Sequence, residues 1–126
     1  MKIHLGTVGH FGLAVRDAKK SADWWRTLFD LRTMFEDDDY VGLTNDDITI
    51  VLFQGTPHPK TIEHMSFHLP DLKALNAALD WLKQHQVDVE DPGDEIGPEA
   101  PGSRNMGLWF RDPDGYRWEL SVLSRR

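Results

Sequence analysis

The stretch His10-Phe11-Gly12-Leu13-Ala14-Val15-Arg16-Asp17 returns later in the chain as His64-Met65-Ser66-Phe67-His68-Leu69-Pro70-Asp71. The two stretches are offset by 54 residues (64 − 10), and each opens on a histidine and closes on an aspartate. Their alternation of apolar with small or polar residues is typical of a half-buried β-strand. Each closing aspartate is followed by a helical pattern and is a suitable N-cap, because its carboxylate can accept the unpaired amides of the first turn. The sequence therefore predicts two copies of one structural unit.

The residues after each aspartate repeat one order of elements. Helical spacing of apolar residues predicts helices over residues 18–29 and 72–85. Three strand-like segments follow each helix, at residues 32–36, 40–44 and 48–53 and at residues 87–90, 107–111 and 117–122. A tight turn is expected at residues 112–115 (Asp-Pro-Asp-Gly), because Pro presets φ and Gly tolerates positive φ. We expect an α+β fold of two βαβββ modules, about residues 7–54 and 61–123, within a single domain of residues 1–126.

The second copy is longer than the first. Aligning the last strands of the two copies pairs Val51 with Glu119, an offset of 68 rather than 54 residues (119 − 51). The additional residues have a place in the segment 91–102, which is rich in Pro and Gly and has no periodicity. We interpret residues 91–105 as a loop that closes over a substrate pocket, with a passive surface loop as the alternative.

The strands that open the two copies and the strand at residues 117–122 divide their residues between two faces in the same way. One face is bulky and apolar, and the other is small or polar and carries His10, His64 and Glu119. Each of these residues alone would be an ordinary polar residue of a strand. Together, at equivalent positions of a repeat, two imidazoles and a carboxylate predict a site for one divalent metal ion (Fe, Mn, Zn, Ni or Co) with open positions for substrate.

Composition excludes several classes of protein. The chain of 126 residues is long enough for one domain with a core. It has no cysteine, which excludes disulfides, thiolate ligands and a cysteine nucleophile. Its net charge of −7, without a basic patch, argues against nucleic-acid binding. It has no apolar run of the roughly 20 residues that a membrane span needs, and no apolar start typical of a secretory signal, so we expect a cytoplasmic protein.

Three stretches, residues 8–17, 62–67 and 110–120, resemble the signature stretches of the vicinal-oxygen-chelate superfamily, the group of glyoxalases, bleomycin-resistance proteins and dioxygenases. The resemblance runs from about residue 7 to residue 123. It implies that the mixed sheets of the two modules curl into a cup around a metal held by His10, His64 and Glu119. It also implies that the metal chelates two oxygens of a small substrate and acts as an electrophile.

Departures from the family patterns narrow the choice of reaction. Glyoxalase I takes a further ligand from the strand that here carries Val51, and valine can neither ligate a metal nor act as a base. Extradiol dioxygenases use an acid-base histidine, for which His68 can substitute, and a tyrosine, whose region here holds Trp109. The anion-binding set of fosfomycin-resistance transferases is not evident, although Arg104, Arg111 and Arg117 are candidates, with solvated surface positions as the alternative. We expect a dioxygenase- or lyase/transferase-type enzyme with Glu119 and His68 as catalytic residues.

A metal-free binding protein is the alternative function. Bleomycin-resistance proteins sequester a drug in an aromatic groove, and the resemblance implies Phe53, Trp109 and Trp118 as residues that would line it here, with core packing as the alternative role of Trp118. We also expect a homodimer, because each module leaves a sheet edge that must be paired or covered. If modules pair between chains, His10 would come from one subunit and His64 with Glu119 from the other.

Overall fold

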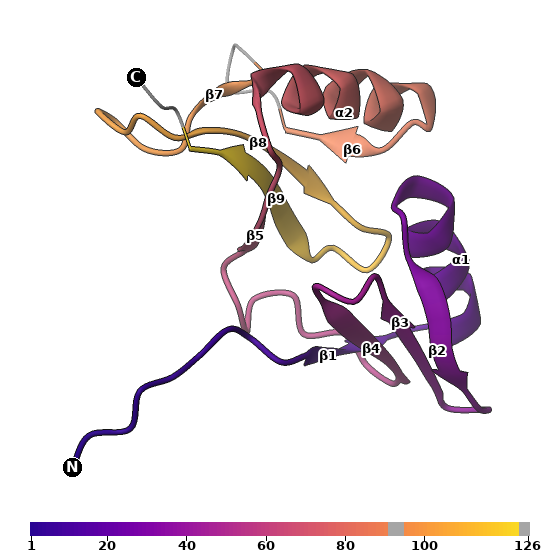
Figure 1. Ribbon diagram of the computed structural model, residues 1–126. Coiled ribbons are helices and arrows are strands. Elements are labelled where there is room, and N and C mark those ends of the chain that lie inside the picture. Colours follow the sequence, from indigo (N-terminus) through magenta and orange to yellow (C-terminus); the bar gives the residue numbers. More distant parts are fainter. Residues whose placement is uncertain (91–94, 124–126) are drawn as a thin grey trace. The chain divides into compact units, whose positions relative to one another are not determined.

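The computed structural model describes residues 1–90 and 95–123, and the chain divides into two compact units, Met1–Pro57 and His58–Arg126 (Figure 1). Each unit contains one helix and one mixed sheet. Within the described ranges, none of the helices is long and apolar enough to cross a membrane.

The first unit has the expected order of elements. Its elements are β1 (Phe11–Val15), α1 (Ala18–Leu28), β2 (Arg32–Glu36), β3 (Tyr40–Thr44) and β4 (Thr49–Gln54). The sheet has the order β1-β4-β3-β2, in which β1 is parallel to β4 and the other neighbours are antiparallel. Helix α1 packs against β3 and β4. A single apolar face of the sheet therefore forms the core of this unit together with the helix.

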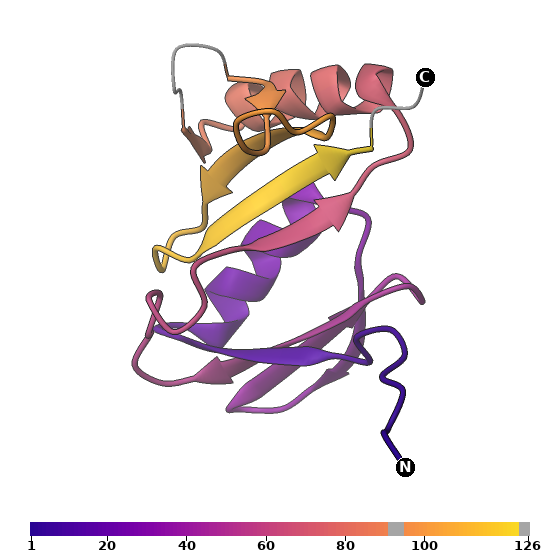
Figure 2. The same ribbon diagram turned by 90° about the vertical axis from the view of Figure 1, so that its left-hand side faces the viewer.

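The second unit repeats this plan with one additional strand. Its elements are β5 (Met65–His68), α2 (Leu72–Gln84), β6 (Asp88–Val89), β7 (Gly97–Pro98), β8 (Met106–Arg111) and β9 (Arg117–Val122). The sheet order is β5-β9-β8-β6, with β7 also pairing with β8. Figure 2 shows β5, β9 and β8 side by side beneath α2, which packs on β6, β8 and β9. The predicted α+β fold of two βαβββ modules is confirmed.

The predicted N-caps are both present. The Asp17 carboxylate accepts the amide of Lys20 at 3.1 Å, and the Asp71 carboxylate accepts the amide of Ala74 at 2.8 Å. Each helix ends one residue earlier than the apolar spacing suggests, at Leu28 and Gln84. The repeat therefore fixes where each helix begins more firmly than where it ends.

The inserted segment differs from the expected structureless loop. Residues Gly97 and Pro98 form the short strand β7, and beyond it the amide of Glu99 donates to the carbonyl of Asn105 at 2.9 Å. The segment therefore returns along β8 as an additional edge of the sheet. Residues 91–94 of the proposed lid lie outside the described residues, and closure over a substrate stays a prediction.

The two sheets confirm the alignment of Val51 with Glu119. In the first unit Val51 lies opposite Gly12, and in the second unit Glu119 lies opposite Ser66. Gly12 and Ser66 each follow the histidine of their repeat by two residues. Val51 thus occupies the position in the first sheet that Glu119 occupies in the second.

Candidate metal centre

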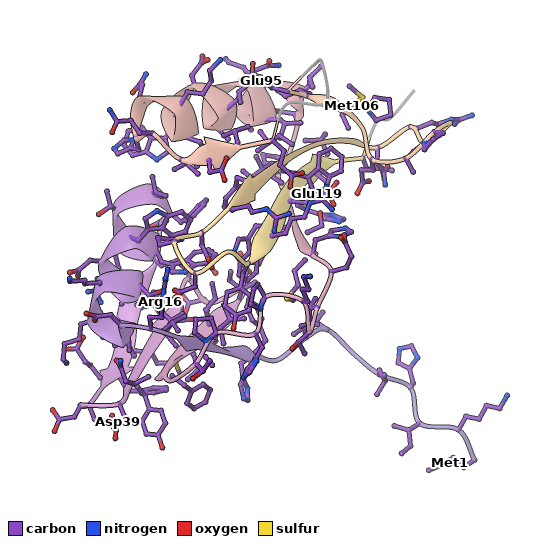
Figure 3. The ribbon with its side chains drawn as sticks, turned by 180° about the vertical axis from the view of Figure 1, so that it is seen from behind. Met1, Arg16, Asp39, Glu95, Met106 and Glu119 are labelled. Atoms are coloured by element: carbon purple, nitrogen blue, oxygen red, sulfur yellow. The ribbon has the colours of Figure 1, made fainter. Side chains whose placement is uncertain are left out.

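Glu119 lies in the middle of β9 and is almost completely buried, with 1% of its surface exposed (Figure 3). Its neighbours Trp118 and Leu120, which point to the opposite face, are buried as well, at 2% and 4%. Among the residues that the structure describes, neither carboxylate oxygen of Glu119 has a hydrogen-bond partner. An ionised carboxylate is costly to bury without a partner, so the position suits a group that binds a cation.

Gly107 on the neighbouring strand β8 makes room for this carboxyl group. A Cβ atom at Gly107 would lie 2.5 Å from Oε2 of Glu119, which is closer than real Cβ contacts allow. Any side chain at this position would therefore displace the carboxyl group. The absence of a side chain at Gly107 therefore leaves the space that the carboxyl group of Glu119 occupies.

His64 lies directly before β5, and its Nε2 atom is 3.8 Å from Oε1 of Glu119. This distance is too long for a hydrogen bond. It brings an imidazole nitrogen and an unpaired carboxylate oxygen close enough to share one cation. The second unit thus assembles two of the three predicted ligands.

Burial, together with the neighbouring carboxyl group of Glu99, raises the pKa of Glu119 to about 7. The Ser66 hydroxyl and the His64 ring lower this pKa. The Ser66 hydroxyl is itself hydrogen-bonded to the Ser121 hydroxyl at 2.6 Å. Without a cation, Glu119 therefore holds a proton at nearly neutral pH, and a bound cation would favour the ionised form.

His10 belongs to the first unit and is exposed, directly before β1, as His64 is before β5. His64 and Glu119 both belong to the second unit, so the structure shows that these two side chains are close together. The position of His10 relative to them is a prediction. Within residues 1–90 and 95–123, no group of three or more His, Asp or Glu side chains is arranged to hold a metal ion. The three-ligand site stays a prediction.

His68 occupies the opposite end of β5 from His64. It is exposed and lies opposite Ser121 in the sheet, one pair beyond the pair of Phe67 with Leu120. Four residues of extended strand span roughly 13 Å. His68 therefore lies four residues further along the strand than His64 and is not part of the candidate metal centre.

Several residues around the centre were not identified from the sequence. Oε1 of Glu63 lies 2.6 Å from Nδ1 of His64, and Arg117 joins Glu63 to Glu90. Arg117 is therefore held in an ion pair, not solvated or free for an anion. The proximity of Glu63 to His64 in sequence was the only available signal, because the contacts of Arg117 depend on strand pairing.

Of the two tryptophans considered for an aromatic groove, Trp118 lies in the core, the commoner role for such a residue, and Trp109 is partly exposed. Trp118 is a core residue that stacks on Phe67 and donates from Nε1 to Asp112 at 3.1 Å. Trp109 is partly exposed and lies under the guanidinium of Arg117, 5.6 Å from its ring centroid. Of the three predicted groove residues, Phe53 is the most open, at 39% exposure.

The sequence model of the Glyoxalase/Bleomycin resistance protein/Dioxygenase superfamily matches residues 7–120. The chain belongs to this superfamily, the vicinal-oxygen-chelate proteins that its signature stretches resemble. A search of curated proteins found no match.

Solved structures of low sequence identity share the fold. A genomically encoded fosfomycin resistance protein, FosX, from Listeria monocytogenes is similar with a TM-score of 0.77 at 17% identity, over 94% of each chain. Lactoylglutathione lyase from Agrobacterium tumefaciens has a TM-score of 0.74 at 14% identity, also over 94% of each chain. The oxidase ChaP-H2 has a TM-score of 0.71 at 16% identity over 94% of each chain. At these identities the likeness concerns the fold alone.

Proposed function

We propose that this protein is a divalent-metal-dependent enzyme that acts on a small, oxygen-rich molecule. The observation that carries the proposal is the carboxylate of Glu119, which is buried without a hydrogen-bond partner among the described residues and lies beside an imidazole nitrogen. A structural glutamate at such a position would normally be paired, because an unpaired buried charge is costly.

The residues fit a divalent cation. His64 and Glu119 would hold it, and His10 would supply the third ligand, from the same chain or from a second copy. A bound divalent ion of the iron, manganese, zinc, nickel or cobalt type supplies electrophilic stabilisation of negative charge on substrate oxygens. Val51 cannot add a ligand from the position equivalent to Glu119, so three protein ligands would leave positions open for two substrate oxygens.

The residues of the chain support catalysis in different ways. Glu119 would contribute negative charge from a buried position, and the space at Gly107 accommodates its carboxyl group. His68 is our candidate for moving a proton at the far end of an extended substrate, because it lies on the same sheet face as Ser66. The neighbouring structures carry the names of a resistance protein, a lyase and an oxidase, so we propose a dioxygenase- or lyase/transferase-type reaction without choosing among them.

A metal-free binding protein is the second candidate, and one observation favours it. In the first unit, Phe35, Tyr40 and Phe53 are between 39% and 44% exposed, and Tyr40 contacts Phe53 edge to face at 5.2 Å. The ring of Phe53 lies over Gly12, where an added Cβ would come within 2.4 Å of it. These rings form an open aromatic surface on the sheet face opposite α1.

Activity with and without metal separates the two candidates. The metal-free protein and the protein reconstituted with Fe(II), Mn(II), Zn(II), Ni(II) or Co(II) should be assayed against catechols, methylglyoxal–thiol adducts and fosfomycin. We expect turnover of one class that requires metal and is lost in Glu119→Gln. Tight binding of an aromatic compound by the metal-free protein, unchanged in Glu119→Gln and without turnover, would instead establish the binding protein.

A further inference from the structure

Charged side chains of the second unit form a continuous network of contacts that ends at His64. Arg117 donates from Nε to both oxygens of Glu90, at 3.0 Å each, and from Nη2 to Oε2 at 2.8 Å. From Nη1 it donates to Oε1 of Glu63 at 2.8 Å. The same Glu63 oxygen lies 2.6 Å from Nδ1 of His64. The order of contacts is therefore Glu90, Arg117, Glu63 and His64.

Arg117 is held in place by several contacts and therefore fixes the position of this network. Its side chain is 24% exposed and that of Glu90 is 29% exposed, so water competes only partly for their contacts. Its planar fork binds one carboxylate with two nitrogens and still has a third nitrogen for Glu63. The guanidinium also lies over the ring of Trp109, and Arg111 contributes a further contact to Glu90 at 3.3 Å. These contacts restrict the positions that Arg117 can take.

Glu63 alone would be a weak partner for His64. Its side chain is 75% exposed, and an exposed ion pair or hydrogen bond of a flexible side chain contributes little. The second contact, with Arg117, is what holds its carboxylate next to the imidazole. Arg117 is on β9 two residues before Glu119, so it fastens the segment before β5 onto the strand that carries the other ligand.

The contact determines which nitrogen of His64 carries the proton. An ionised carboxylate can only accept hydrogen bonds, so Nδ1 must donate. In the neutral ring the lone pair then lies on Nε2, which is the nitrogen 3.8 Å from Glu119. Histidine ligands commonly donate their other ring nitrogen to a carboxylate in this way, which fixes both the tautomer and the orientation of the ring.

We propose that Glu63, held by Arg117 and Glu90, is a positioning residue that presents Nε2 of His64 to the cation next to Glu119. The role in metal binding rests on the function proposed above. The effect on the tautomer and orientation of His64 does not, because it is present in the chain without a metal.

The test uses the full-length metal-free protein at a pH at which the nitrogen-15 shifts of the His64 ring show that it is neutral. Nitrogen-15 NMR of the His64 ring reports its tautomer in the wild type, Glu63→Ala and Arg117→Lys. The matched control is Glu95→Ala, which removes another carboxylate of the same unit from an ion pair with Lys83 at 3.1 Å. Calorimetric titration with Mn(II) and Zn(II) then gives the metal affinity of each protein.

In the wild type and the control we expect the proton on Nδ1. In Glu63→Ala the proton should move to Nε2 in most molecules, and metal affinity should fall roughly 10- to 100-fold. Arg117→Lys keeps the charge but loses the fork, and should lie between the two. An unchanged tautomer in Glu63→Ala, or an unchanged metal affinity in that variant when the wild type binds metal, overturns the inference. If the wild type shows the Nδ1 tautomer, loses it in Glu63→Ala and binds no divalent metal, the positioning of His64 stands and the proposed function fails.

Discussion

At the scale of single residues, the pKa of Glu119 makes the stability of the metal-free protein depend on pH. Burial raises this pKa to about 7, so the folded state binds a proton that the unfolded state releases at lower pH. The stability contributed by the protonated group is complete below the ordinary glutamate pKa and is lost as pH rises through about 7. The loss is about 3–4 kcal/mol at most, since the pKa rises from 4.5 to about 7 and each pKa unit corresponds to about 1.4 kcal/mol.

Urea denaturation of the metal-free wild type and Glu119→Gln, at about pH 5 and about pH 8, measures this contribution. The wild type should lose more stability than Glu119→Gln between the two values, because glutamine does not titrate. Equal losses in both proteins would show that Glu119 ionises normally.

Gly107→Ala should weaken metal binding without unfolding the protein. The added Cβ would lie 2.5 Å from Oε2 of Glu119, and the end of that side chain must move. We expect metal affinity to fall by about tenfold or more, because a displaced ligand loses its geometry. The matched control is Gly55→Ala, whose Cβ would have only an ordinary contact at 3.8 Å with Ala14. Calorimetry that gives equal affinities for the two variants would contradict this role of Gly107.

Alternation along a strand assigns each residue to a face and predicts that His64 and Glu119 lie close together, as they do at 3.8 Å in the structure. It does not identify Gly107 or Glu63. The role of Gly107 depends on a side chain that crosses from β9 to β8, and that of Glu63 depends on Arg117, 54 positions away. These contacts depend on which strands pair with each other, and the periodicity of a single segment gives no information about that pairing.

At the scale of elements, the turn between β8 and β9 is held by Asp112. Its buried carboxylate accepts the amides of Asp114 at 2.9 Å and Tyr116 at 3.1 Å, and Nε1 of Trp118 at 3.1 Å. Gly115 completes the turn with a positive φ of 90°. This arrangement confirms the turn that the Asp-Pro-Asp-Gly sequence predicts and connects it to the core.

Asp112→Ala should lower the free energy of unfolding by about 2–4 kcal/mol, because it leaves three donors without their acceptor. Asp112→Asn should cost less, since its carbonyl oxygen can still accept the two amides while its NH₂ group meets the donor of Trp118. Chemical denaturation measures both losses. A loss below about 0.5 kcal/mol for the alanine variant would show that the turn does not need this carboxylate.

Most elements were predictable because their signals are local. The two helices follow from apolar spacing and from the aspartates that cap them, and β2, β3 and β9 have the predicted bounds. Strand β7 was not predictable, because a Gly-Pro pair has no strand pattern of its own. It exists through pairing with Met106 and Gly107 of β8.

At the scale of the whole molecule, the repeat predicts the fold but not the assembly. We expect a homodimer, because β1 and β5 are edge strands of their sheets, and the edge of a sheet must be paired or covered. Sedimentation at micromolar concentration should give twice the mass of one chain. A monomer under these conditions would contradict the expected dimer.

Mixing two inactive variants tests whether the units pair between chains. If His10 comes from one subunit and Glu119 from the other, a mixed dimer of His10→Ala with Glu119→Ala contains one intact site. Refolding the two variants together should then restore metal binding and any activity found, to roughly a quarter of the wild-type level, since half of the dimers are mixed. No recovery, with mixed dimers shown by native mass spectrometry, would place each site within one chain.

The reaction is the part that neither the sequence nor the fold specifies. The same fold occurs in proteins named as a resistance protein, a lyase and an oxidase, so the architecture does not select a chemistry.

The proposal that His10, His64 and Glu119 hold a divalent ion is tested most directly by the metal content of the Glu119→Gln protein. Wild type, Glu119→Gln and the control Glu95→Gln should be dialysed to equilibrium against Mn(II) and analysed for metal per chain. We predict one ion per chain in the wild type and the control and almost none in Glu119→Gln. One ion per chain retained in Glu119→Gln, or none in the wild type, would contradict this metal site.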